Sequence, residues 1–213
     1  MRVLAEKSEA GTIAAILGAA REVASFSELL RTMVIRDLKL RYRNSALGFL
    51  WSLLSPLLMM LVFILVFKVL TQSNIENYPV FLMTGLLPWI FTQGAMVGGL
   101  HSVTGNANLI NKVYFPRELL PMSAVLAGFV QFVVGYVLLM VALLAFGVQL
   151  HVTIAFVPLI MLLNLAFALG LAMVVSVVNV FFRDLQHLVE IGILAWFFLT
   201  PIVYPASQVP PAF

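Results

Sequence analysis

Long apolar runs separated by short polar connections determine what this chain can fold into. A helix needs about 20 apolar residues to cross the hydrocarbon core of a membrane. We predict five such spans, over residues 47–70, 80–100, 119–147, 154–181 and 188–204. Charged residues make up only 10% of the chain, against about 25% in soluble domains. The predicted fold is therefore all-α, a polytopic membrane helix bundle.

The basic residues predict the orientation of the spans. Apart from Lys68, every Lys and Arg either precedes the first predicted span or lies in the connections after the second and fourth. Because cationic connections stay on the cytoplasmic side, we expect an inner-membrane protein with a cytoplasmic N-terminus. Lys68 lies at the outer end of the first span, where its long side chain can reach the headgroups.

We predict an amphipathic helix over residues 25–43. It follows a cytoplasmic tail, residues 1–24, and precedes the first span. One apolar and one basic side are typical of a helix in the membrane interface, although the same helix could contact a cytoplasmic partner. Asp37 and Arg41, four residues apart on the apolar side, predict an ion pair. The apolar side comprises Phe26, Leu29, Leu30, Met33, Val34 and Leu40, and the headgroup-binding candidates are Arg36, Lys39, Arg41 and Arg43.

Polar and small residues inside the spans indicate where helices meet. Several glycines and Pro88 in the second span predict either tight packing or an irregular helix. Four amides are expected to form hydrogen bonds between helices, namely Gln93, Gln131, Asn164 and Asn179. Glu190 should face protein or water rather than lipid, and pairing with Arg183 or His187 is the simplest expectation.

The connection at residues 101–118 has an unusual pattern. Leu109, Ile110 and Val113 form an apolar stripe among polar neighbours, and Pro116 ends the turn. We predict a short helix with an apolar side that another protein could cover. An ordinary ordered loop is the alternative.

No catalytic motif occurs in the sequence. Cysteine is absent, the three histidines are isolated, and no Gly-Lys dipeptide of a phosphate-binding loop exists. We therefore expect no enzymatic site, cofactor or metal in this chain, so that active transport would draw on a gradient or on another subunit. The few scattered charges also make nucleic-acid binding a poor explanation.

Four stretches together resemble the permease subunits of type-2 ABC exporters, in the branch that exports O-antigen, capsule or teichoic acid. They are RDLKLRYRNSALGFLWSLLSPLL, FLMTGLLPWIF, NKVYFPRELLP and FFRDLQHLVEIGILAWFFLTPIVYP, within about Leu29 to Pro205. The resemblance implies a homodimer of permeases with two ATPase subunits, which hold the ATP and Mg. It also implies six spans, so we expect the sequence to be a fragment that ends before the last one.

The resemblance assigns residues to roles. The connection at 101–118 corresponds to the coupling helix that docks on the ATPase, and the corner at Arg183 lies near the same partner. A lipid-linked polysaccharide needs a wide path, on whose aromatic walls sugar rings can stack. The coupling candidates are Leu109, Ile110, Asn111, Lys112, Val113, Tyr114, Phe115, Pro116, Arg117, Glu118, Arg183 and Asp184; the pore-lining candidates are Trp89, Phe91, Tyr136, Trp196 and Tyr204.

Other functions remain alternatives at this level. A drug or lipid exporter would share the same spans and charges. A gradient-driven transporter predicts paired carboxylates or broken helices near the membrane centre, but Glu190 is the only carboxylate in the predicted spans. A membrane enzyme lacks a recognisable site, and a scaffold would leave the coupling stretch unexplained.

Overall fold

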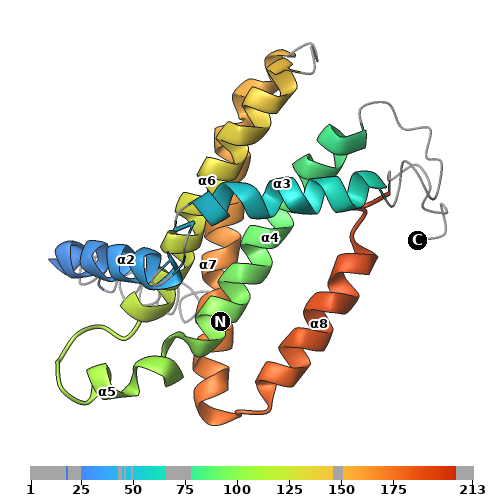
Figure 1. The fold of residues 1–213 in the computed structure, drawn as a ribbon. Helices are drawn as coiled ribbons and strands as arrows, with labels where there is room; N and C mark the ends of the chain where they lie inside the picture. Colours follow the sequence, from blue (N-terminus) through green and yellow to red (C-terminus); the bar gives the residue numbers. More distant parts are fainter. Residues whose placement is uncertain are drawn as a thin grey trace, which may run out of the picture.

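The structure is a computed structural model that describes residue 18 and residues 25–42, 45, 47–48, 50–65, 78–145 and 151–204. Every regular element in these ranges is a helix (Figure 1). Among the described residues, three helices are long and apolar enough to cross a membrane, over Phe81–Ser102, Leu119–Val141 and Val152–Phe181. The prediction of an all-α membrane bundle is confirmed. Arg43, Lys68 and nearly all of the predicted tail lie outside the described residues.

Helix α4 (Tyr78–Ser102) is the centre of the bundle. It packs along both α6 (Leu119–Ala145) and α7 (Val157–Phe181), and those two helices also contact each other. Buried apolar side chains such as Leu86, Val125 and Ala168 fill the space between them. The outer faces of α6 and α7 are apolar and exposed, as expected for helices that are surrounded by lipid.

Glycines allow the close approach of α4 to its neighbours. A Cβ atom at Gly99 would lie 2.6 Å from the Cβ of Ala172 on α7 and 2.7 Å from its Cα. At Gly135 on α6, a Cβ would lie 2.9 Å from a methyl group of Leu87. Because α4 also runs as one helix through Pro88, tight packing, rather than an irregular helix, is the correct interpretation of this segment.

Two asparagines of α7 form hydrogen bonds with α4. Thr92 donates to Asn164 Oδ1 at 3.0 Å. Asn179 Nδ2 donates to the carbonyl of Leu100 at 2.7 Å, in the last turn of α4, where carbonyls lack partners within the helix. The predicted interhelical role of these two asparagines is confirmed. Gln93 on α4, by contrast, is exposed and has no hydrogen-bond partner among the described residues.

Two shorter helices correspond to the first and fifth predicted spans. Helix α3 (Leu50–Ile64) and helix α8 (Leu185–Leu199) each have 15 residues. In Figure 1, α3 runs across α4 and α6, whereas α8 runs beside α4. The chain turns before α3 at Gly48, whose φ of 48° favours glycine. Helix α8 ends before residue 204, its predicted end, because Thr200 precedes a proline and adopts extended backbone.

The connections lie at two ends of the bundle. The α4–α6 connection, with η2 (Thr104–Asn106) and α5 (Ala107–Ile110), lies at the same end as the corner between α7 and α8, at the bottom of Figure 1. The short helix η3 (Val152–Phe156) precedes α7 at the opposite end. Helix α2 (Ser27–Tyr42) packs against α6 at the side of the bundle.

Candidate functional site

The connection between α4 and α6 is an ordered loop with one turn of helix. The Asn106 side-chain amide donates to the carbonyl of Ser102 at 2.8 Å, and the Ser102 hydroxyl donates to the carbonyl of Gly99 at 2.7 Å. These bonds fix the loop to the end of α4. Pro116 cannot donate a backbone hydrogen bond, and a new turn begins there, with Leu119 N donating to its carbonyl at 3.2 Å.

The apolar stripe that was predicted on this loop divides into two parts. Leu109 and Ile110 are half-buried and pack toward α2. Val113 is 52% exposed, and the adjoining Tyr114 is 90% exposed. Leu109 and Ile110 are therefore partly covered within this chain, by a cluster that includes Met33 of α2. Val113 and Tyr114 are the apolar surface that the loop offers to a partner.

A small apolar cluster joins α2 to the loop and to the start of α6. Its buried members are Met33, Phe115, Leu119 and Leu120, surrounded by Phe26, Leu29, Leu30, Leu109 and Ile110. Most of the predicted apolar side of α2 thus faces protein of the same chain instead of membrane lipid. Leu40, near the other end of α2, is 53% exposed and is available to lipid.

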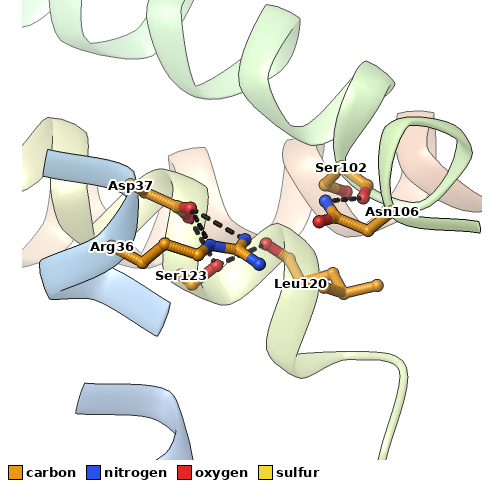
Figure 2. A network of polar contacts seen from close by, with 6 residues as sticks. All are labelled: Arg36, Asp37, Ser102, Asn106, Leu120 and Ser123. Atoms are coloured by element: carbon orange, nitrogen blue, oxygen red, sulfur yellow. Dashed lines mark hydrogen bonds and ion pairs between the residues drawn. The ribbon is translucent and has the colours of Figure 1, made fainter. Parts of the chain in front are cut away.

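Asp37 attaches α2 to α6 through polar contacts (Figure 2). Its carboxylate accepts a hydrogen bond from the buried Ser123 hydroxyl at 2.8 Å and pairs with Arg36 at 2.8 Å. Arg41 instead donates to Gln131 on α6. The predicted pairing of Asp37 with Arg41 is wrong, because helix α6 supplies a different partner for each side chain. The charged acceptor strengthens the bond from Ser123.

Sequence reasoning did not select Ser123 as a site residue. It is one small polar residue in a long apolar run, and serine is common at helix contacts inside membranes. Only the position of α2 distinguishes it from other serines. Among the proposed headgroup-binding residues, Lys39 is exposed, whereas Arg36 and Arg41 have the partners described above.

The loop surface beside Tyr114 is hollowed. A groove of about 320 Å³ is lined by Ile110, Asn111, Lys112, Val113, Tyr114, Phe115 and Arg117. Its two cationic side chains, an exposed aromatic ring and an aliphatic side chain suit a protein surface that carries both apolar and acidic groups. Glu118, which follows the groove residue Arg117 in the sequence, is also exposed.

The corner between α7 and α8 lies at the same end of the bundle as the loop (Figure 1). Arg183 and Asp184 are both exposed there. Glu190 lies 4.0 Å from His187, so histidine rather than Arg183 is its neighbour in the structure. Within the described ranges, no three His, Cys, Asp or Glu side chains are grouped to hold a metal ion.

The predicted pore-lining aromatics pack between helices of this chain. Trp89 and Trp196 meet edge to face, with ring centroids 5.6 Å apart. Phe91 stacks on a phenylalanine of α6 at 4.8 Å, and Tyr136 contacts the edge of that same ring. Tyr204 donates to a carbonyl at the end of α8. Trp89 and Phe91 are buried, so they present little surface to a passing molecule in this conformation.

Apolar crossing helices, together with an ordered loop and a side helix at one end, define the membrane domain of a multi-span protein. Residues 28–213 match the family described as ABC-2 type transporter. The chain belongs to this family.

Proteins similar to this chain include two O-antigen export permeases. The O-antigen export system permease protein RfbA of Myxococcus xanthus is 41% identical over 189 residues, which cover 89% of this chain and 73% of that protein. RfbA of Klebsiella pneumoniae is 36% identical over 187 residues, with coverages of 87% and 72%. The polysialic acid transport protein KpsM of Escherichia coli is 24% identical over 186 residues, with coverages of 85% and 71%.

Proposed function

We propose that this chain is the permease subunit of an exporter that moves a lipid-linked polysaccharide across the inner membrane. A separate subunit binds and hydrolyses ATP, and two copies of the permease form the transport unit. Membership of the ABC-2 type transporter family supports the architecture, and the names of the similar proteins support the substrate class. In this proposal the end of the bundle that carries α5 faces the cytoplasm, as the basic residues predict.

The observation that carries the proposal is the exposed pair Val113 and Tyr114 on a well-ordered loop. Tyr114 is 90% exposed, although its neighbour Phe115 is only 7% exposed. A tyrosine presents a large apolar surface with few rotatable bonds, which is why tyrosine is enriched at protein interfaces. Both side chains therefore suit a pocket on the ATPase subunit, with Lys112 and Arg117 beside them for acidic groups.

The contacts of the loop would transmit movement of the ATPase to the membrane helices. Asn106 and Ser102 bond the loop to α4, and Phe115 packs in one cluster with Leu119 at the start of α6. Close-packed side chains transmit displacement instead of absorbing it. A force on Tyr114 would thus act on α2, α4 and α6 together.

The test is recovery of an ATPase subunit with the purified full-length gene product. Val113→Asp and Tyr114→Asp should each lower the recovered ATPase by about tenfold or more, since a charge buried without a partner weakens an interface by several kcal/mol. Val152→Asp is the matched control, because Val152 is 89% exposed but lies at the opposite end of the bundle. Leu109 and Ile110 are unsuitable targets, since a charge there would disrupt the cluster with α2.

Each result has a defined meaning. Unchanged recovery with Val113→Asp and Tyr114→Asp would contradict the docking role of the loop. A wild-type preparation without any ATPase would contradict the proposed function and favour a gradient-driven carrier. A drug or lipid exporter would also bring an ATPase, so the polysaccharide is tested separately, by loss of surface polysaccharide from cells that lack the gene.

A further inference from the structure

A groove of about 530 Å³ lies between α4 and α8. Most of its lining is apolar and includes the half-buried aromatic side chain of Phe197. Two polar side chains, Gln93 on α4 and Glu190 on α8, also line it. Figure 1 shows that these two helices run beside each other from the end of the bundle that carries α5.

The carboxylate of Glu190 is unusual for its position. It is the only Asp, Glu, Lys or Arg in helices α3, α4, α6, α7 and α8. Its side chain is 70% exposed, and its neighbour His187 is at 4.0 Å, the limit for an ion pair. Lipid is an unfavourable environment for such a group, so a carboxylate in a membrane helix normally faces a water-filled cavity or a binding partner.

Gln93 is the second polar group without a structural role. Gln131, Asn164 and Asn179, the three other amides of helices α4, α6 and α7, each hydrogen-bond to another helix. Gln93 has no such partner within the described part of the chain. With a rise of 1.5 Å per residue, it lies about 14 Å from the end of α4, and Glu190 lies about 8 Å from the start of α8. Both depths are measured from the same end of the bundle.

The chemistry of the groove matches a sugar chain better than a lipid. A carboxylate and an amide can hydrogen-bond to hydroxyl groups, and aromatic rings can pack on the apolar CH faces of sugar rings. A few polar groups in a mainly apolar and aromatic lining are typical of sites that orient a ligand. A lipid tail would leave both polar groups without partners.

The charge of the groove restricts which sugars fit. Glu190 repels an anionic group, and the described membrane helices contain no Lys or Arg that would offset this repulsion. We infer that the α4–α8 groove contacts the polymer during export and selects uncharged sugar units over acidic ones. This inference rests on the proposed function, and it adds a substrate preference that is located at Gln93 and Glu190.

The first experiment tests access and charge without any substrate. Because these 213 residues contain no cysteine, Gln93→Cys supplies the only thiol among them, and the transporter without this substitution gives the background reaction. The full transporter in lipid vesicles is treated with a cationic and an anionic methanethiosulfonate reagent. Both should react, the cationic reagent about three- to tenfold faster after correction for intrinsic reactivity, as expected for one charge at close range. Adding Glu190→Gln should remove that difference.

Three results would overturn the inference at this stage. An unreactive Gln93→Cys would show that lipid or protein covers the groove, and a rate ratio that Glu190→Gln leaves unchanged would show that the carboxylate does not act there. Efficient disulfide formation between two copies of Glu190→Cys would identify the groove as a dimer interface, which also overturns it.

The second experiment measures selection. The reconstituted transporter is supplied with a polyprenyl-pyrophosphate-linked oligomer of neutral hexoses and with the same lipid carrying sialic acid units. Wild type should prefer the neutral oligomer by about tenfold, and Glu190→Gln should reduce this ratio by about three- to tenfold. Leu188→Gln is the control, since Leu188 is 66% exposed on the same helix but does not line the groove.

The readouts separate this inference from the proposed function. The ATPase should co-purify at wild-type levels with Glu190→Gln, because Glu190 lines a different groove from Tyr114, and the two grooves share no residue. A wild type that exports both oligomers equally, or whose ratio is unchanged by Glu190→Gln, would overturn the groove's role while leaving the permease function intact. A wild type that recovers no ATPase and exports neither oligomer would contradict the proposed function itself.

Discussion

Helix α2 and helix α8 are attached to the bundle in opposite ways. Met33 of α2 enters a cluster with the fully buried Leu119, and Asp37 accepts a hydrogen bond from Ser123 of α6. Helix α8 contacts α4 and α7 less extensively than α2 contacts α6. Beside α8 lies a groove that contains a carboxylate.

This difference in packing indicates which helices would move together in such a protein. The α2–loop–α6 region is closely packed and would move as one body, since packed interfaces resist gradual deformation. Helix α8 shares fewer contacts with that body and can change its position at a lower free-energy cost. In the proposed function, the first region receives the movement of the ATPase and the second borders the path of the polymer.

Removing side-chain volume from the α2–loop cluster should have the largest effect on stability. Leu120 is 1% exposed, so Leu120→Ala should destabilise the protein by about 2–5 kcal/mol through lost burial and the remaining cavity. Thermal unfolding of the purified full-length protein measures this as a fall in Tm. Leu188→Ala on α8, at a position that is 66% exposed, should change the stability by less than about 0.5 kcal/mol. Equal falls in Tm would contradict the contrast between the two regions.

Two glycines of α4 test its close packing with α7. A Cβ atom at Gly99 would lie 2.6 Å from Ala172, whereas one at Gly94 would meet nothing within 4 Å. Gly99→Ala should therefore destabilise the bundle by about 1–3 kcal/mol. Gly94→Ala should be neutral or stabilise it by up to about 1 kcal/mol, because alanine favours the helix. A difference in Tm that reverses this order would show that α4 and α7 are not in contact at Gly99.

The sequence predicted those features that depend on one helix at a time. Apolar runs predicted the helices, because this signal is local, and the small residues of the second span predicted either tight packing or an irregular helix. The predicted partner of Asp37 was wrong because a spacing of four residues identifies neighbours only within the same helix. The partial burial of Leu109 in a cluster with Met33 could not be predicted, since these two residues lie far apart in the sequence. The groove at Glu190 depends on how two helices are arranged relative to each other, and a local sequence pattern does not determine that arrangement.

The bond between Asp37 and Ser123 can be measured by a double-mutant cycle. Asp37→Ala and Ser123→Ala should show a coupling free energy of about 1–2 kcal/mol in unfolding experiments, as expected for a hydrogen bond to a charged group. The cycle of Asp37→Ala with Arg41→Gln is the control. These two residues are not paired in the structure, so their coupling should be below about 0.5 kcal/mol. A larger value would restore the ion pair that the sequence predicted.

The smallest expected effect on stability is that of Gln93→Leu. Its comparison with Asn164→Leu distinguishes an amide with a functional role from one with a structural role. Asn164 accepts a hydrogen bond from Thr92, so Asn164→Leu should destabilise the bundle by about 0.6–2 kcal/mol. Gln93→Leu removes no hydrogen bond within the described residues, and the Tm should stay within about a degree of wild type. If Gln93 nevertheless contacts the polymer, Gln93→Leu should reduce export of the neutral oligomer while Tm and ATPase recovery are unchanged. A fall in Tm as large as that of Asn164→Leu would show that Gln93 has a structural partner and would remove it from the groove's proposed role.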